Sequence, residues 1–88
     1  MNQDSIDINN LSKLQWACRR GMLELDVLLG NFLNEAYGAL PDADKHLFVN
    51  LLSCPDPEIF AWLMGREEAD PEHQYMVEKI RAHVRSRF

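Results

Sequence analysis

The chain has 88 residues, of which 47% are hydrophobic, and this length suits a single domain, residues 1–88, with one modest core. Its formal net charge of −5 disfavours binding to the like-charged phosphate backbone of nucleic acid. It has neither the run of about 18 apolar residues that a membrane helix needs nor the basic and apolar stretches of a signal peptide, so we expect a cytoplasmic protein without stable membrane insertion.

Apolar periodicity predicts a first helix over residues 8–19. Leu11, Leu14 and Cys18 recur at a spacing that brings them onto one side of a helix, and Gly21 follows where such a helix ends. We expect this side to face the core. Cys18 is therefore interpreted as a small buried hydrophobic residue and not as a nucleophile.

The second predicted helix spans residues 22–37, carries a leucine-rich stripe and is closed by Gly38. Pro41 and Asp42 open the third, in which leucines and Phe48 form a compact apolar stripe. Proline at the beginning of a helix and glycine after its end are common residues at these positions, so the boundaries are well marked.

PDPEIFAWLM, residues 55–64, begins a short fourth helix with Asp56 as N-cap, Pro57 at the first helical position and Gly65 beyond the end. DPEHQYMVEKIRAHV, residues 70–84, repeats this arrangement in a fifth helix. No stretch alternates β-branched with polar residues as a strand would. We therefore expect an all-α fold, a small single-domain bundle of five helices.

The first helix predicts an outward-facing tryptophan. Because a helix turns by about 100° per residue, Trp16 lies nearly opposite the apolar side, and Arg20 lies on the same outward face, close enough to rest against the indole. Two interpretations remain open: Trp16 packs against another helix of the bundle, or it belongs to a binding surface. Tryptophan and arginine are both enriched at protein interfaces.

The second helix extends this hypothesis. Leu23, Glu24 and Val27 lie away from its leucine stripe, and Asp26 lies at the margin. Isolated apolar residues are normal on a surface, but together with Trp16 they are typical of a continuous patch with charged edges.

Gly21 separates the two predicted helices. It can adopt a positive φ at this junction, or it can remove a side chain so that another backbone approaches closely. A simple helix cap is the alternative.

RGMLE, residues 20–24, matches the Arg-Gly-x-x-Glu signature of a known family. This is the family of small flavinylation factors, often called SdhE in bacteria, that assist attachment of FAD to the succinate dehydrogenase flavoprotein subunit. WACRRGM, ELD and DPEIFAWLM also resemble bacterial members, and the resemblance covers nearly the whole chain. Mitochondrial relatives carry an N-terminal targeting extension that this sequence does not show.

The resemblance implies an assembly factor and not an enzyme. Its members bind the flavoprotein subunit of succinate dehydrogenase, and in bacteria that of fumarate reductase, and promote covalent linkage of FAD to a histidine of that subunit. FAD would thus be the partner's cofactor, with none bound stably by this chain, which also lacks the G-x-G-x-x-G dinucleotide motif. Transient stacking of flavin on Trp16 remains a lesser alternative.

The resemblance also suggests roles. Arg20 would pair with a carboxylate or carbonyl of the partner, Glu24 would orient that arginine or accept a hydrogen bond, and Gly21 would permit close approach. The predicted partner-binding residues are Trp16, Arg19, Arg20, Gly21, Leu23, Glu24, Asp26 and Val27.

Two other classes of function would make different demands on the chain. A regulatory interaction module, such as an antitoxin to a small membrane-associated toxin, would need a similar exposed patch. A small enzyme with Glu24 or Asp26 as general base would need a pocket that the sequence does not indicate.

The remaining titratable residues predict no further site. His46, His73 and His83 lack the spacing of a helical metal site and are interpreted as solvated or helix-end residues. Cys54 precedes a proline-rich turn without an obvious base nearby.

The C-terminal cations Lys79, Arg81, Arg85 and Arg87 divide between two helix faces. A solvated helix end, where cations are favoured by the macrodipole, explains them better than nucleic-acid binding does.

Overall fold

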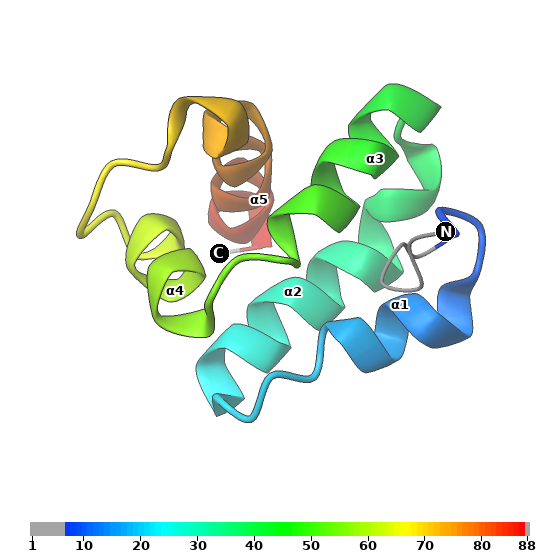
Figure 1. Cartoon of the computed structure of the whole chain (residues 1–88), viewed down its shortest axis with the longest axis horizontal. Coiled ribbons are helices and arrows are strands. Elements are labelled where there is room, and N and C mark those ends of the chain that lie inside the picture. Colours follow the sequence, from blue (N-terminus) through cyan, green and yellow to red (C-terminus); the bar gives the residue numbers. More distant parts are fainter. Residues whose placement is uncertain (1–6, 88) are drawn as a thin grey trace.

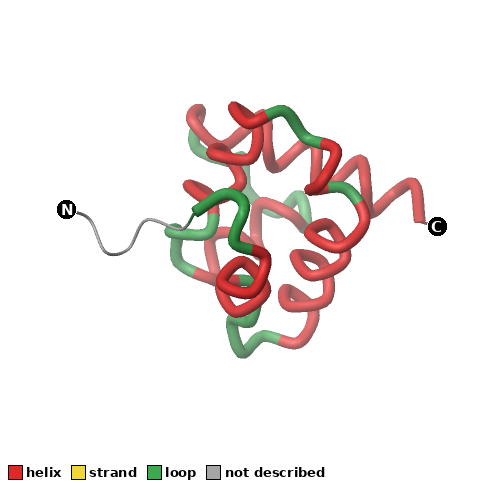
Figure 2. Tube along the Cα trace, turned by 90° about the vertical axis from the view of Figure 1, so that its right-hand side faces the viewer, coloured by secondary structure: helices red, strands yellow, loops and turns green. Residues whose placement is uncertain are grey.

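The computed structural model describes residues 7–87 and is built of helices joined by short loops (Figure 1). No strand occurs in this described part of the chain (Figure 2), which confirms the predicted all-α class. The predicted domain 1–88 extends beyond it at both ends. The elements are α1 (Leu11–Ala17), α2 (Leu23–Glu35), the 3₁₀ turn η1 (Tyr37–Ala39), α3 (Asp42–Leu51), α4 (Asp56–Leu63), the 3₁₀ turn η2 (Pro71–His73) and α5 (Gln74–Arg87).

The core lies where the C-terminal helix meets the others. α5 packs against α2, α3 and α4, and α1 packs against α2. An aromatic group joins α2 to α3, with ring centroids 5.5 Å apart for Phe32 and Phe48 and 5.3 Å apart for Tyr37 and Phe48. These rings and the leucine stripe of α2 form the core, which also takes in Leu14 and Cys18 of the first predicted helix. The prediction that Leu11 faces the core is wrong: it is 55% exposed, because it is the first residue of the shortened α1 and lies outside the packed part of that helix.

The first helix is shorter at both ends than predicted. The Asn10 side chain accepts a hydrogen bond from the Lys13 backbone at 3.1 Å and begins the helix there. Ile8, in the preceding turn, is buried, and its carbonyl accepts a hydrogen bond from the Tyr37 hydroxyl at 2.7 Å. At the other end the helix stops at Ala17, so the residues after Cys18 no longer follow helical spacing.

The second and third helices lie close to their predicted bounds. α2 ends at Glu35, and Gly38 lies in η1 rather than directly after the helix. α3 begins at Asp42 behind Pro41, whose fixed φ of −62° suits the entry to a helix.

The fourth helix differs from prediction at its beginning. Asp56 is the first helical residue and not the N-cap, which is Pro55, and no side-chain cap forms there. The Asp56 carboxylate is instead engaged with Arg20. Gly65 follows the helix with a φ of +74°, as its predicted position beyond the end requires.

The fifth helix is preceded by η2, which takes up Pro71 and His73 before the α-helix begins at Gln74. Its buried residues are Met76, Val77 and Ile80. None of the described helices is both long and apolar enough to cross a membrane.

Candidate functional site

Exposed side chains from both helices lie where α1 gives way to α2. Trp16 is 73% exposed, Leu23 76% and Val27 49%, so the structure confirms that all three point away from the core. Glu24 is exposed in the first turn of α2 and Arg19 in the preceding loop. We call this set, Trp16, Arg19, Leu23, Glu24 and Val27, the α1–α2 surface.

Arg19 is the arginine that lies against the indole. Its guanidinium carbon is 5.8 Å from the centroid of the Trp16 ring, a distance typical of a cation–π contact. The prediction that Arg20 takes this position is wrong. It extended helical spacing to Arg20, whereas the helix ends at Ala17 and the chain turns before that residue.

Arg20 points into the protein, and its side chain is only 16% exposed. Its Nε donates to Oδ1 of Asp56 at 2.7 Å, and its two terminal nitrogens donate to the carbonyls of Ala17 at 2.7 Å and Cys54 at 3.1 Å. Its backbone N–H donates to Oδ1 of Asp26 at 2.6 Å. We call these five residues the Arg20 network; it fastens the junction to α1, α2 and the beginning of α4.

Asp26 and Glu24 share the first turn of α2 but differ in surroundings. Both carboxylates are favoured by the positive end of the helix dipole. Asp26 is half-buried and accepts the Arg20 backbone N–H, whereas Glu24 is exposed to solvent. Asp26 therefore helps to hold the loop between α1 and α2 in place, whereas the Glu24 carboxylate is free to contact a partner.

Gly21 occupies the turn of the junction with a φ of +88°. This confirms the positive φ that its position suggested. A Cβ built on Gly21 would meet nothing within 4 Å, so the space beside it is open on the side of solvent. Within the described chain, no other residue packs into the space that the absent side chain of Gly21 leaves.

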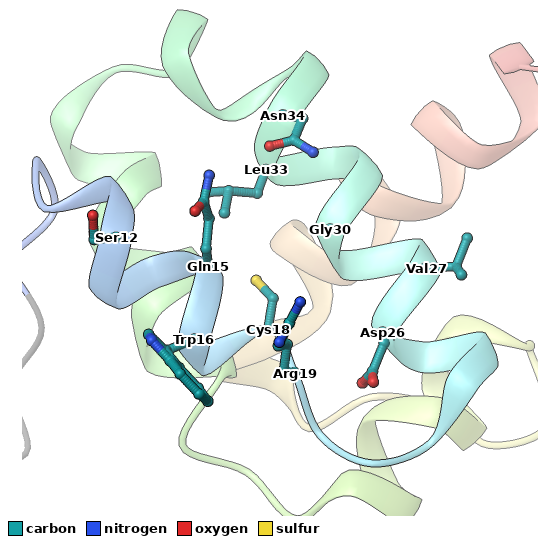
Figure 3. A pocket seen from close by; sticks show the side chains of 10 residues that line it. All are labelled: Ser12, Gln15, Trp16, Cys18, Arg19, Asp26, Val27, Gly30, Leu33 and Asn34. Atoms are coloured by element: carbon teal, nitrogen blue, oxygen red, sulfur yellow. The ribbon is translucent and has the colours of Figure 1, made fainter.

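A groove of about 560 Å³ separates α1 from α2 beside this surface. Figure 3 shows that α1 supplies Gln15 and Trp16 and that α2 supplies Gly30 and Asn34 to its lining. Asp26 also lines the groove, so this carboxylate has beside it a pocket that the sequence did not indicate. Because that carboxylate already accepts the Arg20 N–H, it is held as a structural acceptor.

Cys18, at the base of the same groove, is 3% exposed. Burial raises the pKa of its thiol to about 12, because the charged thiolate is poorly solvated there. The structure thus confirms Cys18 as a small hydrophobic core residue.

The sequence did not reveal one pair of residues, Cys54 and His73. His73 lies at a helix end, directly before α5, which is one of the two predicted settings, but it is buried and not solvated. Its ring stacks on Trp62 at 5.7 Å and its Nε2 lies 3.2 Å from the Cys54 sulfur. Cys54 therefore has an imidazole neighbour after all. Burial raises the pKa of the Cys54 thiol, which disfavours its thiolate form.

Neither histidines nor cysteines gather into a metal centre in the described chain. Among residues 7–87 no group of three or more His, Cys, Asp or Glu side chains is arranged to hold a metal ion. His46 is exposed, as predicted.

The basic C-terminal end folds back onto an acid of α2. Nε2 of His83 lies 2.9 Å from Oε1 of Glu35, and Arg87 donates to the other oxygen of the same carboxylate. Arg81 pairs with Glu78 at 3.2 Å. Arg81 and Arg87 are thus paired with carboxylates of the same chain, which argues further against a nucleic-acid surface. The Arg81–Glu78 pair follows from i, i+3 spacing, whereas sequence spacing did not indicate the contacts of Glu35.

Comparison with known proteins gives consistent matches along nearly the whole chain. A family model described as flavinator of succinate dehydrogenase matches residues 12–84. The FAD assembly factor SdhE of Shewanella oneidensis is 52% identical over 77 residues, covering 86% of this chain and 94% of the relative. That of Photobacterium profundum is 48% identical over 78 residues, covering 88% and 89%. The solution structure of a UPF0350 protein matches with a TM-score of 0.73 and 39% identity, covering 94% of this chain and 89% of the other.

Proposed function

The chain belongs to the family of succinate dehydrogenase flavinators, and we propose that it is an FAD assembly factor that binds the flavoprotein subunit of succinate dehydrogenase and promotes covalent attachment of FAD to it. The family membership that the Arg-Gly-x-x-Glu pattern suggested is thereby confirmed. Fumarate reductase, whose flavoprotein subunit is related, is proposed as a second partner, and the bacterial cytoplasm as the place of assembly.

The observation that carries the proposal is the α1–α2 surface. It exposes an indole with a stacked guanidinium beside two aliphatic side chains, and such residues supply much of the binding energy in protein interfaces. Arg19 provides a positive edge and Glu24 a negative one. The matching face of the flavoprotein would be apolar at its centre, with an acidic group opposite Arg19 and a hydrogen-bond donor opposite Glu24.

Assistance by binding alone explains how a chain of this size can promote flavinylation. The reacting histidine belongs to the partner, and the flavin is held there. A factor that binds one conformation of the flavoprotein more tightly than others raises the population of that conformation. We propose that the favoured conformation is the one in which the partner's histidine and the flavin are aligned for self-catalysed attachment.

The test combines a deletion with one substitution. Deleting the gene should abolish the covalent flavin fluorescence of the succinate dehydrogenase flavoprotein subunit in a denaturing gel, and the unaltered gene should restore it. Trp16→Ala should fail to restore it, because losing a central aromatic residue typically weakens an interface by about 2 kcal/mol or more. The matched control is Met64→Ala, because Met64 is also an exposed apolar residue, 42% exposed, and lies after α4. This variant should restore the covalent flavin fluorescence fully.

Undiminished covalent flavin in the deletion strain would contradict the proposed function. Full restoration by Trp16→Ala would instead leave the function standing and remove the α1–α2 surface from it. Because Trp16 is largely exposed, the folded state should survive this substitution, and a circular dichroism melt should confirm that.

A further inference from the structure

The guanidinium of Arg20 is already occupied within the protein. Three of its donors are bonded, to one carboxylate and two carbonyls, and the side chain is only 16% exposed. An arginine that turned outward to reach a partner would leave the Asp56 carboxylate and the Cys54 carbonyl without this donor. The geometry therefore favours a role for Arg20 inside the chain.

The Arg20 network determines how the two halves of the α1–α2 surface stand relative to each other. Trp16 and Arg19 lie before the turn, and Leu23 and Glu24 lie after it. Between them, the Arg20 backbone is bonded to Asp26 of α2 and its side chain to the end of α1. A loop held in its bound shape loses less conformational freedom when a partner docks, so it binds more tightly than a mobile one.

Asp56 lies in a different part of the sequence, 36 positions after Arg20, at the beginning of α4. Its carboxylate is 27% exposed and forms the charged contact of the network. Charge-assisted hydrogen bonds of this kind are stronger and more directional than neutral ones. The first residue of α4 thus helps to hold the α1–α2 junction through its contact with the Arg20 guanidinium.

We propose that Asp56 and Asp26 are positioning residues for partner binding, which act through Arg20 by holding the α1–α2 surface in its docking shape, and that Arg20 itself acts from within the protein. The inference rests on the proposed function. It replaces the idea that the signature arginine pairs with a group of the partner.

A double-mutant cycle distinguishes the two roles of Arg20. The dissociation constant for the purified flavoprotein subunit is measured by calorimetric titration for the unaltered chain, Arg20→Ala, Asp56→Ala and the double variant. We expect each single substitution to weaken binding about tenfold and the double variant to bind no more weakly than Arg20→Ala, since Asp56→Ala then removes a contact that Arg20→Ala has already broken. If Asp56→Ala cost the same tenfold in the Arg20→Ala background as in the unaltered chain, Asp56 would not act through Arg20, and that additive result would overturn the proposal.

Glu58→Ala is the matched control, because Glu58 is exposed and shares the first turn of α4 with Asp56. It changes the charge at that helix end equally, and its dissociation constant should equal that of the unaltered chain. A tenfold loss in Glu58→Ala would mean that charge at α4, and not the Arg20 network, governs binding, and would overturn the proposal.

Two further measurements separate positioning from general loss of structure. At saturating factor concentration the flavinylation rate should match that of the unaltered chain, because only affinity is affected. In nuclear magnetic resonance spectra of the free protein, Asp56→Ala should shift the Gly21 amide and Trp16 indole signals while those of the α5 core residues stay in place. Asp56→Asn, which keeps an acceptor oxygen, should show smaller changes in the same direction and serves if Asp56→Ala unfolds.

The outcomes also separate this inference from the proposed function. If the unaltered chain does not bind the flavoprotein, both fail. If it binds and Asp56→Ala binds equally well, the positioning role fails and the assembly function stands.

Discussion

At the scale of single residues, Gly21 is a position where the backbone conformation restricts which residue can be accommodated. Its φ of +88° is a conformation that residues with a Cβ adopt at a cost, although open space surrounds the position. Gly21→Ala should therefore lower the free energy of unfolding by about 1 kcal/mol through backbone strain alone. Gly21→Asn should lose less, since asparagine tolerates a positive φ better. Urea denaturation followed by fluorescence measures both.

Gly38 provides the matched control for this prediction. It also has open space where a Cβ would lie, but its φ is not positive. Gly38→Ala should leave the free energy of unfolding unchanged or raise it slightly. Equal losses at Gly21 and Gly38 would show that backbone conformation does not cause the effect.

Residue positions could be predicted only as far as the helices extend. Periodicity correctly turned Trp16, Leu23 and Val27 away from the core, because each lies within a regular helix. It failed for Arg20, which follows the end of α1 and takes its direction from Asp56 in another part of the chain. Such a contact depends on how helices pack against one another, which local spacing does not encode.

At the scale of elements, one carboxylate ties α2 to α5. Glu35, near the end of α2, accepts from Arg87 and contacts His83, both of which belong to α5. The hydrogen bond from Arg87 holds the pKa of Glu35 below its ordinary value, because it stabilises the charged form, and His83 adds to this. The tie is therefore strongest while Glu35 is ionised.

Acid should weaken this tie. A carboxyl whose pKa is lowered in the folded state contributes stability above its ordinary pKa, and that contribution disappears as the pH falls through the folded-state pKa. The thermal midpoint of the unaltered chain should therefore fall more steeply below about pH 4.5 than that of Glu35→Gln, which has no such charge to lose.

Glu67→Gln, an exposed glutamate in the loop after α4, is the control for this comparison. Its pH profile should run parallel to that of the unaltered chain. Parallel profiles for Glu35→Gln and the unaltered chain would contradict the role assigned to Glu35.

Helix ends show a similar division between what local sequence determines and what packing determines. The positions of glycine and proline predicted the ends of the five helices to within a few residues, since the effects of these residues on the backbone are local. The use of Asp56 could not be anticipated in this way. An aspartate before a proline is a typical N-cap, but here the Arg20 guanidinium engages that carboxylate instead.

At the scale of the whole molecule, a single core joins α1 to the C-terminal helix, and Cys18 belongs to it. Its thiol is buried and has a pKa raised to about 12, so in the folded state it is both shielded and protonated. Alkylation requires an accessible thiolate, and here that requires the core to open.

Thiol labelling should therefore report global unfolding. In a Cys54→Ser chain, where Cys18 is the remaining cysteine, reaction with iodoacetamide should be slow without denaturant and accelerate with urea in parallel with the fluorescence transition. Rapid labelling without urea would show that α1 opens independently of the rest. The unaltered chain, which carries both cysteines, provides the comparison.

The overall fold class and the exposed surface could thus be predicted, whereas the long-range pairs could not. Cys54 and His73 are 19 positions apart, and Glu35 and Arg87 are 52 apart. Each pair forms because helices bring distant positions together, and neither partner alone carries a pattern that identifies the other.

The exposed indole and leucine of the α1–α2 surface have a colloidal consequence for the unbound protein. Exposed apolar groups that bind a partner can also contact one another on neighbouring copies of the protein, which favours aggregation at high concentration. The net charge of −5 opposes this by mutual repulsion between copies. Solubility should therefore be lowest near the isoelectric point, about pH 5.0, and storage at neutral pH and low ionic strength should keep the free factor dispersed.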